Sequence, residues 1–192
     1  NGTNASPIDV SERQLREIWL PPFKKQIDAG VFTFMASHNE INGIPAHAND
    51  FLLNDILKNE WKFDGFVVSD WMDIERIHKL HKITPGNKQS ILKSVNAGMG
   101  MHMHGPGFKR PLLELVEEGL VPVKKIDDAC SAILKAKFLL GLFENPIVDQ
   151  SKTESILFNE AHKELALNVA RKSIVLLKND GILPLSNPKK IL

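Results

Sequence analysis

The segment best suited to carry out chemistry is residues 65–71, GFVVSDW, in which an apolar run ends in a hydroxyl, a carboxylate and an indole. Residues 66–68 do not alternate with polar residues, which is typical of a strand buried on both faces of a parallel sheet. In α/β barrels the active site lies at the carboxyl ends of such strands, so Asp70 is a candidate catalytic acid. The alternative is that Asp70 caps a helix that begins near Asp73.

Apolar runs on either side of this segment predict two more strands, and amphipathic helices separate the strands from one another. The expected strands are 31–36, 66–68 and 99–104, with a polar loop over 37–45, and the expected helices are 23–29, 50–61, 73–80, 88–97 and 112–118. Strands that alternate with helices are typical of right-handed βαβ units, so the fold class is α/β with a parallel sheet. So few strands do not close a barrel, which predicts that they belong to a larger fold.

Beyond Pro122 the pattern changes to helices. Apolar residues at helical spacing predict a helix over 126–138, and residues 144–151 are expected to be a linker. A long helix is expected over 160–178, and residues 189–192 are typical of the beginning of another strand.

The composition limits the kinds of partner. Lysine and arginine number 24 against 23 acidic residues, and the charges are interspersed, so a neutral partner is favoured over nucleic acid or a membrane surface. No apolar run approaches the roughly 18 residues that span a bilayer. The single cysteine, Cys130, excludes an internal disulfide and a cysteine-based zinc site. Its apolar neighbours predict a buried, inert thiol.

Several motifs, in order along nearly the whole chain, resemble those of the family 3 glycoside hydrolases, the β-glucosidase and β-xylosidase group. Residues 11–23 are similar to the segment that leads to the sixth barrel strand of that family, and residues 39–45 to the loop after it. Residues 65–71 resemble the seventh strand, which bears the nucleophile, and residues 137–146 resemble the end of the barrel domain. Residues 170–179 resemble the helix that leads into the family's second domain.

The resemblance implies the C-terminal part of a (β/α)8 barrel, roughly three βα units, followed by helices and the beginning of an α/β/α sandwich. The implied domains are residues 1–143, from the barrel, and residues 144–192, comprising the linker, a helix and the beginning of the second domain. The remaining segments of a longer enzyme would then be partners of this chain, and no cofactor is expected. Many bacterial relatives are periplasmic, so the parent protein is expected to be periplasmic or secreted.

The implied activity is retaining hydrolysis of terminal β-linked glucose, or of related β-glycosides, through a covalent glycosyl-enzyme on Asp70. Trp71 is a candidate platform for the sugar ring, with ordinary core packing as its alternative. His38 stands where many relatives have an aromatic residue, and it would bond the nucleophile, bond a substrate hydroxyl, or have no role. Met35 is also a substrate-binding candidate. The general acid, and the Lys-His pair that binds glucose hydroxyls, are expected outside this chain.

Two alternatives remain open. His102 and His104 project to the same side of an expected strand, which would suit a metallohydrolase if Glu40 or Asp70 supplied a further ligand. The other alternative is that the chain is a truncated, inactive remnant or a weak carbohydrate-binding fragment, because both the general acid and the sugar-binding pair would be missing.

Overall fold

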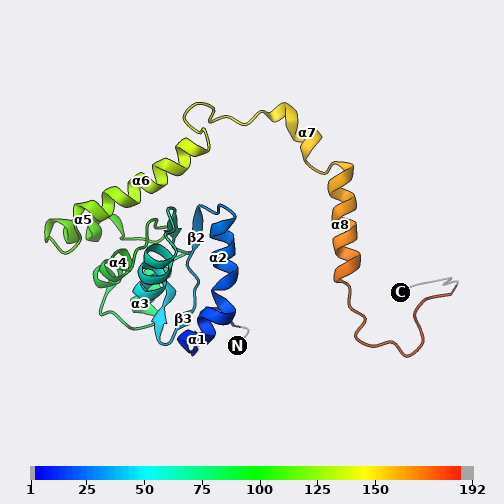
Figure 1. The fold of residues 1–192 in the computed structure, drawn as a ribbon, viewed down its shortest axis with the longest axis horizontal. Coiled ribbons are helices and arrows are strands. Elements are labelled where there is room, and N and C mark those ends of the chain that lie inside the picture. The colour runs from blue at the N-terminus through cyan, green and yellow to red at the C-terminus, as the bar shows by residue number, and fades with distance from the viewer. Residues whose placement is uncertain (1–2, 187–192) are drawn as a thin grey trace. The chain divides into compact units, whose positions relative to one another are not determined.

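The structure is a computed structural model that describes residues 3–186. It divides into two compact units, of which the first ends at Glu144 and the second begins at Asn145 (Figure 1). The first unit combines helices with short strands, which confirms the α/β class, and the described part of the second unit is helical. No helix in residues 3–186 has the length and apolar character that crossing a bilayer would require.

The elements follow one another along the chain with short connections. The strands of the first unit are β1 (Pro7–Ile8), β2 (Thr33–Met35), β3 (Glu40–Ile41), β4 (Ile44–Pro45) and β5 (Phe66–Val68). Its helical segments are α1 (Glu12–Gln14), η1 (Leu15–Trp19), α2 (Pro21–Asp28), η2 (Ala46–Ala48), η3 (Phe51–Glu60), α3 (Asp73–Lys79), α4 (Asn87–Asn96), α5 (Lys109–Glu117) and α6 (Val123–Leu139). The second unit contains η4 (Gln150–Lys152), α7 (Thr153–Ile156) and α8 (Glu160–Ser173).

Two parallel strands, β2 and β5, place the Asp70 segment. They pair in a register that sets Met35 opposite Val68. Separately, β1, β3 and β4 form a small mixed sheet, because Asn42 and Gly43 turn the chain between β3 and β4. The polar loop expected over 37–45 therefore contains a short hairpin.

The strand expected over 99–104 is wrong as a continuous strand. Only two isolated parallel bridges join this segment to the β5 region, between Val68 and Met101 and between Trp71 and His104. A side chain replaces part of the ladder, because the backbone N–H of Met103 donates to Oγ of Ser69. The segment still follows β5 in the parallel order, but among the described residues no closed barrel is present.

The expectation that residues 31–36 form a buried strand is also wrong in part. The structure shortens the strand to Thr33–Met35, whose side chains are exposed or half-buried. The physical reason is that β2 pairs with β5 along one edge, and its other edge has no strand partner within residues 3–186.

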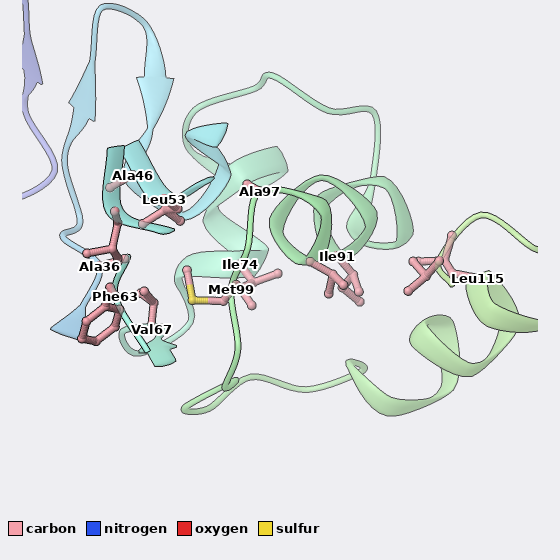
Figure 2. Close-up of a cluster of buried hydrophobic side chains, with 13 residues drawn as sticks. Ala36, Ala46, Leu53, Phe63, Val67, Ile74, Ile91, Ala97, Met99 and Leu115 are labelled. Carbon is pink, nitrogen blue, oxygen red and sulfur yellow. The ribbon is translucent and has the colours of Figure 1, made fainter. Parts of the chain in front are cut away.

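A buried apolar cluster holds β5 against the helices that follow it. Val67 from β5, Ile74 from α3, Ile91 from α4 and Leu115 from α5 are all almost inaccessible to solvent. Figure 2 shows these side chains among others of the cluster. Each contributes on the order of 1.5–3 kcal/mol through burial, so the cluster fixes the end of β5 relative to the beginning of α3. Asp70 lies between those two points.

Two expectations for the helical part of the chain differ from the structure. Helix α8 ends at Ser173, and Ile174 is already extended, so the helix does not reach residue 178. No residue of α8 is buried, and the helix therefore lacks the apolar contact that would favour a longer one. Cys130 on α6 is exposed rather than buried. The strand expected over 189–192 lies outside the described residues.

Candidate active site

Asp70 lies two residues beyond the end of β5, in a backbone held from two sides. Ser69 before it is fully buried, and its N–H donates to the carbonyl of Met101 at 2.8 Å. The N–H of Asp70 itself donates to Nε2 of His47 at 2.9 Å. The Asp70 side chain is 25% exposed. The arrangement presents a partly accessible carboxylate on a rigid main chain.

The alternative that Asp70 caps the following helix is wrong. Helix α3 begins at Asp73, its N-cap position is Met72, and no side chain supplies a capping hydrogen bond. Oδ1 of Asp70 instead accepts the N–H of Trp71 at 2.6 Å. Met72 adopts φ 61°, a left-handed conformation that costs on the order of 1–3 kcal/mol for a non-glycine residue. This turn separates the carboxylate of Asp70 from the helix that it would otherwise cap.

His38 bridges two carboxylates. Its Nε2 lies 3.0 Å from Oδ2 of Asp70, and its Nδ1 lies 2.5 Å from Oδ2 of Asp73. The structure thus brings together Asp70 and His38, which are 32 positions apart in the sequence, because β2 and β5 are neighbours. Both ring nitrogens of His38 are engaged by protein groups.

Asp73 is the buried anchor of this cluster. Its side chain is only 3% exposed, and an isolated carboxylate at such a position would be costly. Arg76, one helical turn later on α3, donates from Nη1 to Oδ1 of Asp73 at 2.6 Å. The same Nη1 lies 3.1 Å from Nδ1 of His38. Asp73 is therefore paired through both oxygens, one with a guanidinium and one with an imidazole.

His47 contacts both aspartates of the cluster and is a neutral imidazole. Its side chain is 2% exposed, and burial lowers the pKa of His47 to about 4, although the charges of Asp73 and Asp70 oppose that shift. Because Nε2 accepts the N–H of Asp70, the single ring proton must be on Nδ1. Nδ1 faces Oδ2 of Asp73 at 3.5 Å, which suits that tautomer.

Trp71 is a surface residue beside Asp70. Its side chain is 55% exposed, so the alternative of core packing is wrong. The indole stacks on the imidazole of His104, with ring centroids 3.8 Å apart and planes 15° from parallel. An exposed aromatic ring held at a fixed angle is a surface on which the apolar face of a sugar can rest.

Met35 is exposed as well, at 53%, but it faces a different feature. With Trp19, Phe23 and Phe34 it lines an apolar cavity of about 220 Å³, and Asp70 is not among the lining residues. The backbone register nevertheless places Met35 opposite Val68, two positions before Asp70.

The proposed histidine metal site is wrong. His102 stacks on Phe108, whereas His104 stacks on Trp71. Oε2 of Glu40 lies 2.8 Å from Nδ1 of His81. Among the described residues, Glu40 forms no potential metal-binding group with His102 or His104.

Among the side chains that the structure describes, the one group of three or more histidine, cysteine or acidic residues whose ligand atoms come within 4.8 Å of one another is His38, Asp70 and Asp73. These atoms already bond one another, and the Arg76 guanidinium beside them disfavours a second cation. A hydrogen-bonded network accounts for this cluster better than a metal centre does.

The sequence did not predict that Asp73, Arg76 and His47 belong to this cluster. The spacing of Asp73 and Arg76, three apart on an expected helix, is a signal for an ion pair. His47 lies in an apolar context, PAHA, which indicates a buried imidazole. Neither signal specifies that these groups would meet around Asp70.

Comparison with known proteins places the site in a family context. A family model described as the glycosyl hydrolase family 3 N terminal domain matches residues 1–136. A β-xylosidase of Formosa agariphila is 39% identical over 198 residues, covering 98% of this chain and 27% of the relative. A periplasmic β-glucosidase of Salmonella typhimurium is 33% identical over 183 residues, covering 93% of this chain and 24% of the relative.

A solved structure, that of a β-glucosidase from Erythrobacter marinus, superimposes with a TM-score of 0.86 at 40% identity. The match covers 95% of this chain and 24% of that structure. The chain therefore spans about a quarter of the length of the proteins that it matches.

Proposed function

Because the chain belongs to glycosyl hydrolase family 3, we propose that it carries the nucleophile of a retaining glycosidase that removes terminal β-linked glucose or a related sugar such as xylose. The named activities of the relatives, β-xylosidase and β-glucosidase, support this class of substrate. Asp70 is the proposed nucleophile. The observation that carries the proposal is the carboxylate of Asp70, one-quarter exposed at the end of a buried parallel strand and oriented by hydrogen bonds.

In the proposed first step, an oxygen of ionised Asp70 attacks the anomeric carbon as the bond to the leaving oxygen breaks. A second carboxylic acid, proposed to lie outside residues 1–192, protonates that leaving oxygen. In the second step, the same second residue, now a carboxylate, takes a proton from water as the water oxygen attacks the anomeric carbon, and Asp70 leaves as a carboxylate. A nucleophile must be ionised, and the donors around Asp70 favour that state: the N–H of Trp71 at 2.6 Å and the imidazole of His38 at 3.0 Å.

Trp71 is the proposed platform for the sugar ring, supported by its exposure and its fixed stacking on His104. Met35 is proposed to border the substrate from the neighbouring strand, because its register position is opposite Val68. His38 is proposed to border the sugar-binding site through its contact with Asp70.

The architecture of the parent enzyme is part of the proposal. Residues 1–143 would supply the C-terminal portion of a (β/α)8 barrel, and residues 144–192 a linker, helix and beginning of a sandwich domain. The parallel pairing of β2 with β5, continued by bridges to residues 101 and 104, supports the barrel order. A periplasmic or secreted location is proposed from the periplasmic relative.

The direct test is to trap the covalent intermediate. The protein, expressed from its complete natural coding region, is incubated with 2-deoxy-2-fluoro β-glucosides and β-xylosides bearing an activated leaving group. Peptide mass mapping should then place the sugar on Asp70. A label on another carboxylate would refute the nucleophile assignment. The absence of both label and turnover would favour the remnant or sugar-binding alternative, which sugar titration by calorimetry then distinguishes.

A further inference from the structure

We infer that His38 is a positioning residue that holds the nucleophile as a doubly protonated imidazolium, locked between Asp70 and Asp73 and balanced by Arg76. This inference rests on the proposed function of Asp70, and it assigns His38 to the carboxylate instead of to a substrate hydroxyl. The juxtaposition that carries it is a single imidazole with one carboxylate oxygen at each ring nitrogen, 3.0 Å away at Nε2 and 2.5 Å away at Nδ1.

The count of protons follows from these two contacts. A neutral imidazole has one N–H and one bare nitrogen, so it can donate to only one of two ionised carboxylates. The other carboxylate would then face a lone pair at hydrogen-bond distance, which is repulsive. Only the imidazolium donates to both Asp70 and Asp73 while both carboxylates remain ionised. In this state Nη1 of Arg76, 3.1 Å from Nδ1, makes no hydrogen bond to the ring and donates to Oδ1 of Asp73 instead. Both contacts lie within hydrogen-bond distance, and a charge-assisted bond of this kind is stronger than one between neutral groups.

The charges that face His38 balance in this state. Asp70 follows β5, and Asp73 and Arg76 belong to α3, so two anions and one fixed cation meet the ring. His47 from η2 is kept neutral by burial and adds no charge. A charged His38 makes the group of four, Asp70, Asp73, Arg76 and His38, neutral as a whole. A neutral His38 would leave one negative charge in excess in a partly buried site.

The role of Asp73 and Arg76 is to keep the ring in place. Arg76 donates to Oδ1 of Asp73 at 2.6 Å, and Oδ2 of Asp73 is directed at Nδ1 of His38. The ring orientation then fixes Nε2 toward Oδ2 of Asp70. This resembles the way in which an outer carboxylate orients a histidine that acts on a third group.

The reaction changes the charge that His38 meets. When Asp70 forms the ester with the sugar its negative charge is lost, and when water releases the sugar that charge returns to the carboxylate. An N–H at Nε2 stabilises the returning charge, so His38 is expected to favour departure of Asp70 as well as its ionisation before attack. The proton stays on His38 throughout, and Asp73 keeps it paired while Asp70 is esterified.

The experiment compares His38→Gln, which keeps one donor near the position of Nε2 but removes the charge, with His38→Phe, which removes both. In the enzyme expressed from its complete natural coding region, kcat/KM should fall about 10- to 100-fold in His38→Gln and further in His38→Phe. The acidic limb of the pH–rate profile should move to higher pH in His38→Gln, because the cation beside the carboxylate is gone. The matched control is His162→Gln, an exposed histidine on α8.

Two readouts separate this inference from the nucleophile assignment. Fluoro-sugar trapping on Asp70 tests the nucleophile alone, and it should still label Asp70 in His38→Gln at a reduced rate. Nitrogen-15 NMR of labelled histidines at pH 7 should show both nitrogens of His38 protonated, and one bare nitrogen for His47. If Asp70 is labelled but the pH profile of His38→Gln superimposes on that of the wild type, or His38 is neutral at pH 7, the inference is overturned. If Asp70 is never labelled, the proposed function fails instead.

Discussion

The N–H of Asp70 donates a 2.9 Å hydrogen bond to Nε2 of His47, a side chain that is 2% exposed and lies 23 positions earlier. The main chain of the proposed nucleophile is therefore fixed by a buried imidazole that must remain unprotonated at Nε2. Protonation of His47 would turn its acceptor into a donor and break this bond. The position of Asp70 thus depends on an acid–base state deeper in the protein.

The first prediction concerns stability and pH. Burial lowers the pKa of His47 from 6.5 to about 4, so between these values the unfolded chain binds a proton that the folded chain does not. The contribution of His47 is fully present above pH 6.5 and is lost as the pH falls toward 4, by about 3 kcal/mol in the free energy of unfolding. In His47→Gln the amide oxygen can still accept the N–H of Asp70, but it does not titrate.

Urea denaturation of wild type and His47→Gln at pH 7, 5.5 and 4.5 measures the contribution of His47 to the free energy of unfolding. The stability advantage of the wild type over the variant should shrink as the pH falls, while His162→Gln should follow the wild type at every pH. Parallel curves for wild type and His47→Gln would contradict the prediction.

The second prediction concerns Asp70→Asn. The amide is nearly isosteric with the carboxylate but is a poor nucleophile, so turnover of aryl β-glycosides should fall by on the order of 10³ or more. The unfolding midpoint should change little, because the Asp70 side chain is partly exposed. Asp55→Asn, an exposed acid on η3, is the matched control and should retain full activity. Near-normal turnover in Asp70→Asn would exclude Asp70 as the nucleophile.

Trp71→Ala tests the sugar platform. Loss of the indole should raise KM about 2- to 10-fold, with a smaller effect on kcat, because stacking on an aromatic face contributes on the order of 0.5–1.5 kcal/mol. Thermal stability should hardly change, since the side chain is 55% exposed. Trp19→Ala is the comparison, because Trp19 is equally exposed but lines the apolar cavity. An unchanged KM in Trp71→Ala would mean that the indole does not contact the sugar.

Gly65→Ala tests how closely the segment before β5 approaches the segment before β2. A Cβ at Gly65 would lie 2.0 Å from the backbone oxygen of Phe32, a rigid group that cannot move aside without displacing β2. The substitution should lower the free energy of unfolding by about 1–3 kcal/mol, measured by urea denaturation. Gly86→Ala should be tolerated, because its nearest contact would be the flexible side chain of Gln89 at 3.4 Å. Equal stability of the two variants would contradict the proposed close approach.

Much of the fold was predictable because local signals agree with the structure. The run of residues 66–68 has no polar alternation, and β5 covers those residues. Residues 88–97 were expected to be helical, and α4 is Asn87–Asn96. The segment 99–104 was not predictable in detail, because whether an apolar run becomes a continuous strand depends on its neighbours and here the hydroxyl of Ser69 takes one backbone donor.

The sequence by itself determined the α/β class, the family resemblance and the candidacy of Asp70. Strand burial, helix periodicity and motifs all depend on residues that are close together in the sequence. Only the tertiary structure decided that Asp70 would share an imidazole with Asp73, that Arg76 would pair with that acid, and that a neutral His47 would hold the main chain. The physical reason is that pairing, burial and protonation depend on distances across the fold. Residues 38 and 70 follow strands β2 and β5, residue 47 lies in η2 and residue 73 begins α3. Their spacing in sequence does not encode the distances between them.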